Sequence, residues 1–147
     1  MTLEIKYENG SMTIHLEQFL GCRSISKVKK LVKLIRQSYT PNESEKIVNF
    51  IEKSMETYEA DLKLVKSKII GYESKVKIAK SYLDKSIMYR GKCTRNSSPW
   101  KYHNNYVKQY REELKELQQL LREENKKLNN LKRNKIFYDD CLIVLQG

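Results

Sequence analysis

The stretch LKLVKSKIIGYESKVKIAKSYL, from Leu62 to Leu83, decides the fold. Its apolar side chains recur at alternating intervals of three and four residues, which is the spacing of a coiled-coil seam. The same spacing extends beyond both ends of the stretch. One seam position holds Val48, Met55, Leu62, Ile69, Val76 and Leu83, and the other holds Ile51, Tyr58, Val65, Tyr72, Ala79 and Ser86. So long a repeat predicts one unbroken helix that buries a narrow apolar seam.

A second seam lies in the C-terminal part of the chain. Between the two seams, residues 89–106 read YRGKCTRNSSPWKYHNNY, where glycine, serine and proline interrupt helical structure and Ser98-Pro99 favours a new helix start. A connection of roughly eight residues is short enough to make the two helices antiparallel neighbours. We therefore predict one long helical hairpin over residues 41–147, with its tip at 90–99. The second seam holds Val107, Tyr110, Leu114, Leu117, Leu121, Leu128 and Leu131, with Glu124 as a polar interruption.

The N-terminal residues are typical of a β-hairpin. Apolar and polar side chains alternate from residue 3 to 7 and again from 12 to 16. Between these runs, Asn9-Gly10 favours a two-residue type I′ turn, because both central residues of that turn need a positive φ. The register that follows places all the apolar side chains on one face. Its predicted pairs are Tyr7 with Met12, Ile5 with Ile14 and Leu3 with Leu16.

Two helix starts are predicted after the hairpin. Ser24 is expected to cap a short basic amphipathic helix that reaches Tyr39, and Thr40 with Pro41 and Glu43 has the pattern of a second start. The predicted fold class is therefore mainly α. A β-hairpin and a short helix, residues 1–40, pack at the base of a long antiparallel coiled-coil hairpin. The tail 136–147 fits either a helix or a buried strand, and we favour the helix.

Positive charge is concentrated in one part of the chain. The formal net charge is +11, and residues 75–111 alone carry ten cations and one acid, a net of +9. We call these residues the basic segment. Its neighbours, residues 41–74 and 112–147, carry net charges of −2 and zero. Unrelieved like charge opposes folding, so the basic segment predicts a polyanionic partner.

Aromatic residues are interspersed with these cations. Basic side chains bind a phosphate backbone, while aromatic rings stack on unpaired bases. Trp100 also fits a seam position, where it would only fill the end of the coiled coil, and the lysines could form only a solvated, repelling surface. The candidate binding residues are Lys77, Lys80, Lys85, Tyr89, Arg90, Lys92, Arg95, Trp100, Lys101, Tyr102, Lys108 and Arg111.

No catalytic or metal-binding motif is present. The sequence has no glycine-rich phosphate loop, no HExxH and no CxxC, and its three cysteines are too widely spaced for a disulfide framework. We therefore expect no enzymatic activity, no metal and no cofactor. An apolar run of 18 residues and an N-terminal secretory signal are also missing, which favours a cytoplasmic protein with no membrane partner.

Three functions are compatible with these features. The leading hypothesis is a non-enzymatic binding protein whose hairpin tip docks on nucleic acid, with RNA or single-stranded DNA favoured, or on a nucleoprotein. An alternative is a phage or mobile-element inhibitor that blocks a host nucleic-acid enzyme, such as a CRISPR nuclease, by stoichiometric binding. The second alternative is a structural coiled coil, and the protein could be a monomer or a homodimer. A helix–turn–helix between residues 16 and 36 is disfavoured by its very short first helix.

Overall fold

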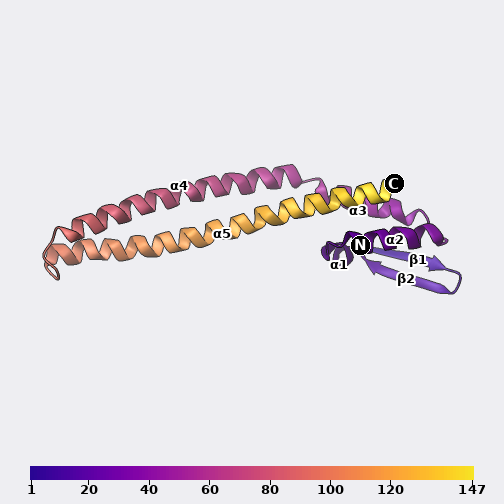
Figure 1. Ribbon diagram of the computed structural model, residues 1–147, viewed down its shortest axis with the longest axis horizontal. Coiled ribbons are helices and arrows are strands. Elements are labelled where there is room, and N and C mark those ends of the chain that lie inside the picture. The colour runs from indigo at the N-terminus through magenta and orange to yellow at the C-terminus, as the bar shows by residue number, and fades with distance from the viewer. The chain divides into compact units, whose positions relative to one another are not determined.

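The computed structural model describes all residues from 1 to 147 (Figure 1). The predicted fold class is confirmed, because the protein is mainly α with an N-terminal β-hairpin and a long helical hairpin. The chain divides into two compact units, Met1–Ala60 with Asn130–Gly147 and Asp61–Asn129. The elements are β1 (Thr2–Tyr7), β2 (Gly10–His15), α1 (Leu16–Gly21), α2 (Ile25–Gln37), α3 (Glu43–Met55), α4 (Tyr58–Gly91) and α5 (Ser98–Gln146).

The register of the β-hairpin differs from the prediction. Each apolar residue of β1 pairs two residues earlier in β2 than expected, in the pairs Tyr7–Gly10, Ile5–Met12 and Leu3–Ile14. Glu8 and Asn9 form the turn without positive φ, and Gly10 opens β2 with a φ of 148°. The turn is therefore not the expected type I′ turn. A shift of two residues preserves the alternation of a strand, so the apolar side chains still share one face.

The strand pattern also ends earlier than expected. Leu16, which we predicted to pair with Leu3, instead begins the six-residue helix α1. The backbone N–H of Leu16 donates a hydrogen bond to the carbonyl of Met1 over 3.0 Å, and the side chain is fully buried. A short turn that contains Arg23 with a φ of 50° then leads into the thirteen-residue helix α2.

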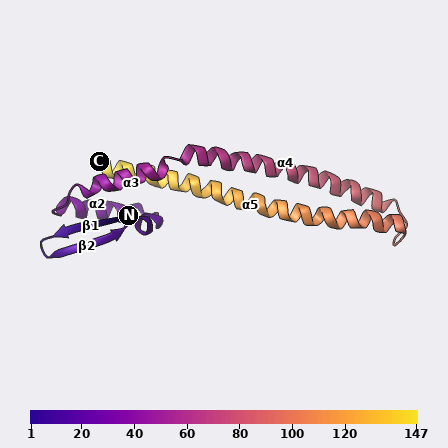
Figure 2. The same ribbon diagram turned by 180° about the vertical axis from the view of Figure 1, so that it is seen from behind.

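One apolar core holds the first unit together. It combines the inner face of the β-hairpin with one face each of α1, α2 and α3 and with the C-terminal end of α5 (Figure 2). The tail 136–147 is helical, which confirms the favoured prediction. It returns to the N-terminal elements, as the sequence indicated. The buried residues are Leu3, Ile5, Leu16, Leu20, Val28, Leu31, Val32, Ile35, Ile47, Ile51, Phe137, Cys141 and Leu145.

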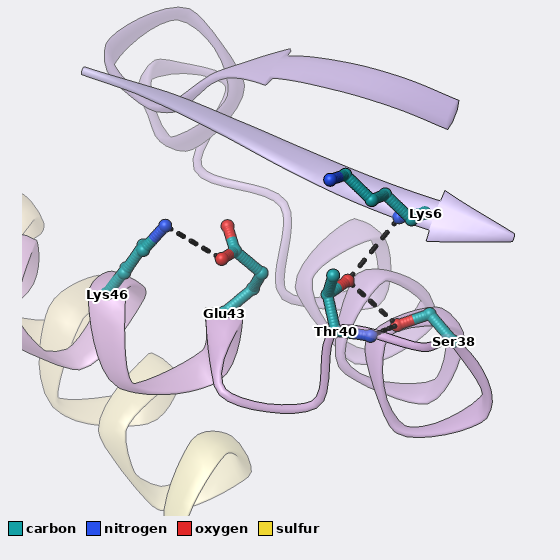
Figure 3. Close-up of polar contacts among 5 residues, drawn as sticks. All are labelled: Lys6, Ser38, Thr40, Glu43 and Lys46. Carbon is teal, nitrogen blue, oxygen red and sulfur yellow. Dashed lines mark hydrogen bonds and ion pairs between the residues drawn. The ribbon is translucent and has the colours of Figure 1, made fainter. Parts of the chain in front are cut away.

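The predicted N-cap at Thr40 is wrong. The hydroxyl of Thr40 accepts the backbone N–H of Lys6 over 3.4 Å (Figure 3). The Lys6 carbonyl in turn accepts the N–H of Tyr39 over 3.0 Å. Ser38 also engages Thr40, because its Oγ accepts the Thr40 N–H over 3.1 Å. With Thr40 bound to β1, α3 begins at Glu43. Tyr39, expected on the apolar face of the preceding helix, lies beyond the end of α2 and is 70% exposed.

The first long helix is also interrupted, which the heptad pattern did not indicate. A turn at Glu56–Thr57 separates α3 from α4, and the N–H of Glu56 bonds to the carbonyl of Lys53 over 3.3 Å. The heptad pattern determines which residues face a seam. It does not determine whether the backbone stays helical where α3 packs against β1 and α2 in the core of the first unit.

The predicted seam is confirmed in the second unit, where α4 and α5 lie side by side and antiparallel (Figure 1). From Leu62 to Ser86 every predicted seam residue is buried or half-buried, and every residue between them is exposed. Val107 is fully buried on the facing helix. Glu124 occupies a seam position as expected and is only 6% exposed. Its Oε1 contacts Lys127 Nζ at 3.1 Å, whereas its Oε2 is buried without a partner.

Candidate nucleic-acid interface

The two helices of the second unit are joined by a short, locally stabilised loop. Helix α4 ends at Gly91 and α5 begins at Ser98. The Oγ of Ser97 accepts the N–H of Trp100 over 3.3 Å, so Ser97 caps α5 one residue before the predicted cap. Asn96 takes a φ of 65°, a left-handed conformation that asparagine tolerates better than most residues. The loop therefore reverses the chain with the help of its own side chains and connects the two helical arms of the basic segment.

Two of the candidate binding residues contact each other beside this loop. Arg90 Nη1 donates a 2.9 Å hydrogen bond to Asn104 Oδ1, and its guanidinium lies 5.8 Å from the ring centroid of Trp100. Arg90 and Trp100 are both half-buried. The partial burial of Trp100 agrees with its expected role in filling the end of the coiled-coil seam. The contact between Arg90 and Trp100 also joins the last turn of α4 to the first turn of α5.

The other ten candidate residues are all exposed, and all belong to the second unit. None of the ten cations of the basic segment forms an ion pair, since the four salt bridges of the protein lie elsewhere in the chain. The exposed candidates are Lys77, Lys80, Lys85, Tyr89, Lys92, Arg95, Lys101, Tyr102, Lys108 and Arg111.

Six aromatic rings form a continuous series of contacts across the two helices. We call this series, defined by the residues below, the aromatic ladder. Adjacent ring centroids are 5.1–6.1 Å apart, and the contacts include both stacked and edge-on pairs. Four of the rings are 37–58% exposed, whereas Tyr110 and His103 are half-buried. In order of contact, the ladder runs Tyr82, Tyr110, Tyr106, Tyr102, His103 and Tyr89.

Lysine ammonium groups flank the ladder. Lys85 Nζ lies 5.8 Å from the ring centroid of Tyr82, and Lys92 Nζ lies 5.9 Å from that of Tyr89. Each of these tyrosines therefore presents a ring and a neighbouring positive charge to solvent. On α5, the hydroxyl of Tyr102 donates a hydrogen bond to the hydroxyl of Tyr106 over 3.5 Å, and this hydrogen bond raises the pKa of Tyr102.

Four members of the ladder were absent from the predicted set of site residues. Tyr82, His103, Tyr106 and Tyr110 were not among the candidates, although the signal for three of them was present. Tyr82 lies one heptad before Tyr89, and Tyr106 and Tyr110 follow Tyr102 at intervals of four residues, which places them on one helix face. The contacts between the two helices, however, depend on their antiparallel register.

The possible metal ligands and the thiols are dispersed over the structure. No three His, Cys, Asp or Glu side chains lie close enough together to hold a metal ion. The three thiols are free, with Cys22 exposed, Cys93 half-buried and Cys141 buried. Cys93 Sγ lies 3.4 Å from the carbonyl of Tyr89 in a contact within one helix turn. The groups gathered at the site are cations and aromatic rings.

No helix carries an apolar stretch sufficient to span a lipid bilayer. Comparison of the chain with protein-family profiles, with curated proteins and with solved structures gave no match.

Proposed function

We propose that the protein is a non-enzymatic, cytoplasmic binding protein whose basic segment docks on nucleic acid, with RNA or single-stranded DNA favoured, or on a nucleoprotein. The observation that carries the proposal is the uncompensated charge of residues 75–111. Nine of their ten cations are exposed, Arg90 is half-buried, and Asp84 is the one acid among them, while the adjacent parts of α4 and α5 interleave both signs. Such a surface opposes folding by self-repulsion unless a polyanion neutralises it.

The placement of the cations, and the way lysine binds phosphate, support a phosphate backbone as the polyanion. Eight of the ten cations are on helices, so their side chains have fixed origins, and Lys92 and Arg95 extend the charge over the loop. Lysines bind phosphates as point charges and release condensed counterions, which makes the affinity depend steeply on salt. For single strands the logarithm of the affinity falls by about 0.7 per contacted phosphate for each tenfold increase in salt.

The test compares two sets of charge-neutralising substitutions in the second unit. The tip variant carries Lys77→Gln, Lys85→Gln, Lys92→Gln and Lys101→Gln. The control variant removes equal charge outside the basic segment through Lys63→Gln, Lys66→Gln, Lys115→Gln and Lys126→Gln, all at exposed positions. Glutamine has nearly the helix propensity of lysine, so both variants should keep their fold.

Fluorescence anisotropy with labelled 20-nucleotide dT and U oligomers, at 50–300 mM salt, gives the affinity and its salt slope. We expect the tip variant to bind at least tenfold more weakly and to lose about three units of slope, which is the effect of four lost phosphate contacts. The control variant should bind within about threefold of the unchanged protein, since its lysines lie outside the site. Equal losses in both variants, or no binding by the unchanged protein, would contradict the proposal.

A stoichiometric inhibitor of a host nucleic-acid enzyme, such as a CRISPR nuclease, is the second candidate. The observation that favours it is the presence of apolar side chains among the cations, with Ile87 36% and Met88 50% exposed. A protein partner would cover such side chains, whereas phosphates would not. A pull-down from bacterial lysate, with and without nuclease treatment, separates the candidates. Recovery of one enzyme after nuclease treatment, and inhibition of that enzyme at a 1:1 ratio, supports the inhibitor.

A further inference from the structure

We propose that the aromatic ladder is a platform on which unpaired bases stack, so that the site selects single-stranded over duplex nucleic acid. This inference rests on the proposed function and names the substrate class and the residues that select it. The ladder consists of six rings from both helices of the second unit, of which Tyr82, Tyr89, Tyr102 and Tyr106 are exposed.

Three rings of the ladder are available to a ligand because they are exposed. Tyr102 is 58%, Tyr82 49% and Tyr89 46% exposed, so these rings are not needed to fill the seam. The seam beneath them is already occupied, for example by the fully buried Val107. Large aromatic surfaces that remain in water beside a seam are available to a ligand with flat apolar faces of its own.

The rings follow one another along α5 and continue onto α4. Tyr102, Tyr106 and Tyr110 succeed one another at intervals of four residues on α5, which places one ring about every 6 Å along the helix axis. Tyr82 and Tyr89 extend the series onto α4 through contacts of 5.5 Å with Tyr110 and 5.6 Å with His103. The rings thus form a connected row, on which successive bases of one strand can each meet a ring.

Positive charge lies beside two of the exposed rings. Lys85 and Lys92 hold their ammonium groups within 6 Å of the ring centroids of Tyr82 and Tyr89. A base stacked on either ring would bring its phosphate within reach of that ammonium group. Sites that bind single strands without reading their sequence combine these two elements, a basic groove for the backbone and aromatic rings for the bases.

A duplex cannot use the ladder in this way. Its bases stack on one another and present only their edges and the sugar–phosphate backbone to a protein. Duplex binding would therefore draw on the lysines alone. The ladder adds affinity for a strand whose bases are free, and that difference is the proposed selectivity.

The experiment changes three exposed rings without changing charge. The leucine variant carries Tyr82→Leu, Tyr89→Leu and Tyr102→Leu, which keeps apolar side chains but removes the flat ring faces. The phenylalanine variant changes the same residues to Phe and keeps the faces. Tyr39→Leu, at a 70% exposed tyrosine of the first unit, serves as the control for the loss of a surface tyrosine.

Binding of each protein is measured with labelled dT20 and with a labelled 20-base-pair duplex at the same salt. We expect the unchanged protein to bind dT20 more tightly than the duplex, and the leucine variant to lose about ten- to a hundredfold in affinity for dT20 alone. The phenylalanine variant and Tyr39→Leu should bind dT20 within about threefold of the unchanged protein, because both keep the ring faces of the ladder.

A second measurement does not depend on how the variants fold. Photocrosslinking of the unchanged protein to an oligonucleotide that contains 5-iodouracil, followed by mass spectrometry, should place the crosslinks on Tyr82, Tyr89, Tyr102 or Tyr106. Crosslinks confined to other residues would overturn the inference.

The outcomes separate this inference from the proposed function. Binding that depends on the basic segment but is equal for dT20 and duplex, and unaffected in the leucine variant, would overturn the ladder's role and leave the proposed function standing. Absence of oligonucleotide binding, with a protein captured from nuclease-treated lysate, would overturn both.

Discussion

Tyr82 on α4 and Tyr110 on α5 stack with their ring centroids 5.5 Å apart and their planes 15° from parallel. This contact joins the two helices of the second unit in the same antiparallel register as the contact between Tyr89 and His103. The ladder therefore has a structural role in addition to the proposed binding role.

The Tyr82–Tyr110 contact should appear as an energetic coupling. We expect a double-mutant cycle of Tyr82→Ala and Tyr110→Ala to give a coupling of about 0.5–1.5 kcal/mol in the free energy of unfolding. The measurement is urea denaturation followed by circular dichroism. As a control, Tyr82→Ala should be additive with Leu121→Ala, since Leu121 lies eleven residues beyond Tyr110 on α5. Additivity in both cycles would argue against a direct contact.

Glu124 should be replaceable with a gain in stability. Its Oε2 is buried without a partner in an otherwise apolar seam, and an unsatisfied buried acceptor costs about 1–3 kcal/mol. Glu124→Leu is therefore expected to raise the free energy of unfolding by at least about 1 kcal/mol. Glu116→Leu, at an exposed position of the same helix, should change it little. A loss of stability in Glu124→Leu would mean that the carboxylate has an important partner in solution.

Glu124→Leu also tests whether Glu124 fixes the partner and the register of the coiled coil. A buried polar residue can fix the partner and register of a coiled coil at a cost in stability. We expect Glu124→Leu to self-associate at concentrations where the unchanged protein does not, as measured by light scattering on a sizing column. Unchanged mass over the whole concentration range would show that Glu124 has no such role.

The substitution Gly→Ala should have opposite effects at two positions. Gly71 lies within α4 with open space around its Cα, so Gly71→Ala is expected to stabilise the protein by about 1 kcal/mol through helix propensity. Gly10 also has open space, but its φ of 148° belongs to a region that side-chain-bearing residues avoid. Gly10→Ala should therefore destabilise by about 1–3 kcal/mol. Thermal and urea unfolding of both variants check the two signs.

Stability should fall at alkaline pH because of Cys141. Burial raises the pKa of this thiol from 9.0 to about 11. The protonated thiol therefore contributes stability that is fully present below pH 9 and is lost as the pH rises toward 11. Between pH 8 and 10.5 the unchanged protein should lose about 2 kcal/mol more than Cys141→Ala, measured by urea unfolding at both pH values. Parallel losses in the two proteins would contradict the buried, protonated thiol.

Local patterns predicted which residues are buried better than they predicted backbone geometry. The faces of β1 and β2 were correct although the register was wrong by two residues, because an alternation of period two cannot distinguish registers that differ by two. The seam from Leu62 to Ser86 was correct for a similar reason, since the heptad spacing fixes a face whatever the partner helix does.

The failures arose where residues distant in sequence decide the outcome. Thr40 has the sequence of an N-cap, yet its hydroxyl is engaged by Lys6, 34 residues earlier. The aromatic ladder combines rings from two helices, and only their register brings Tyr82 to Tyr110. The distribution of charge, by contrast, could be counted from the sequence, and the structure adds that nine of the ten cations are exposed and that none forms an ion pair.

The contacts of Lys6 with Tyr39 and Thr40 also bear on aggregation. A two-stranded sheet has two open sides, and each could recruit a strand from another molecule. Tyr39 and Thr40 occupy the backbone groups on the outer side of β1 at Lys6. Recruitment of a foreign strand along that side would have to displace a segment of the same chain. The chain itself therefore obstructs the β1 edge of the sheet at Lys6 against the addition of a strand from another molecule.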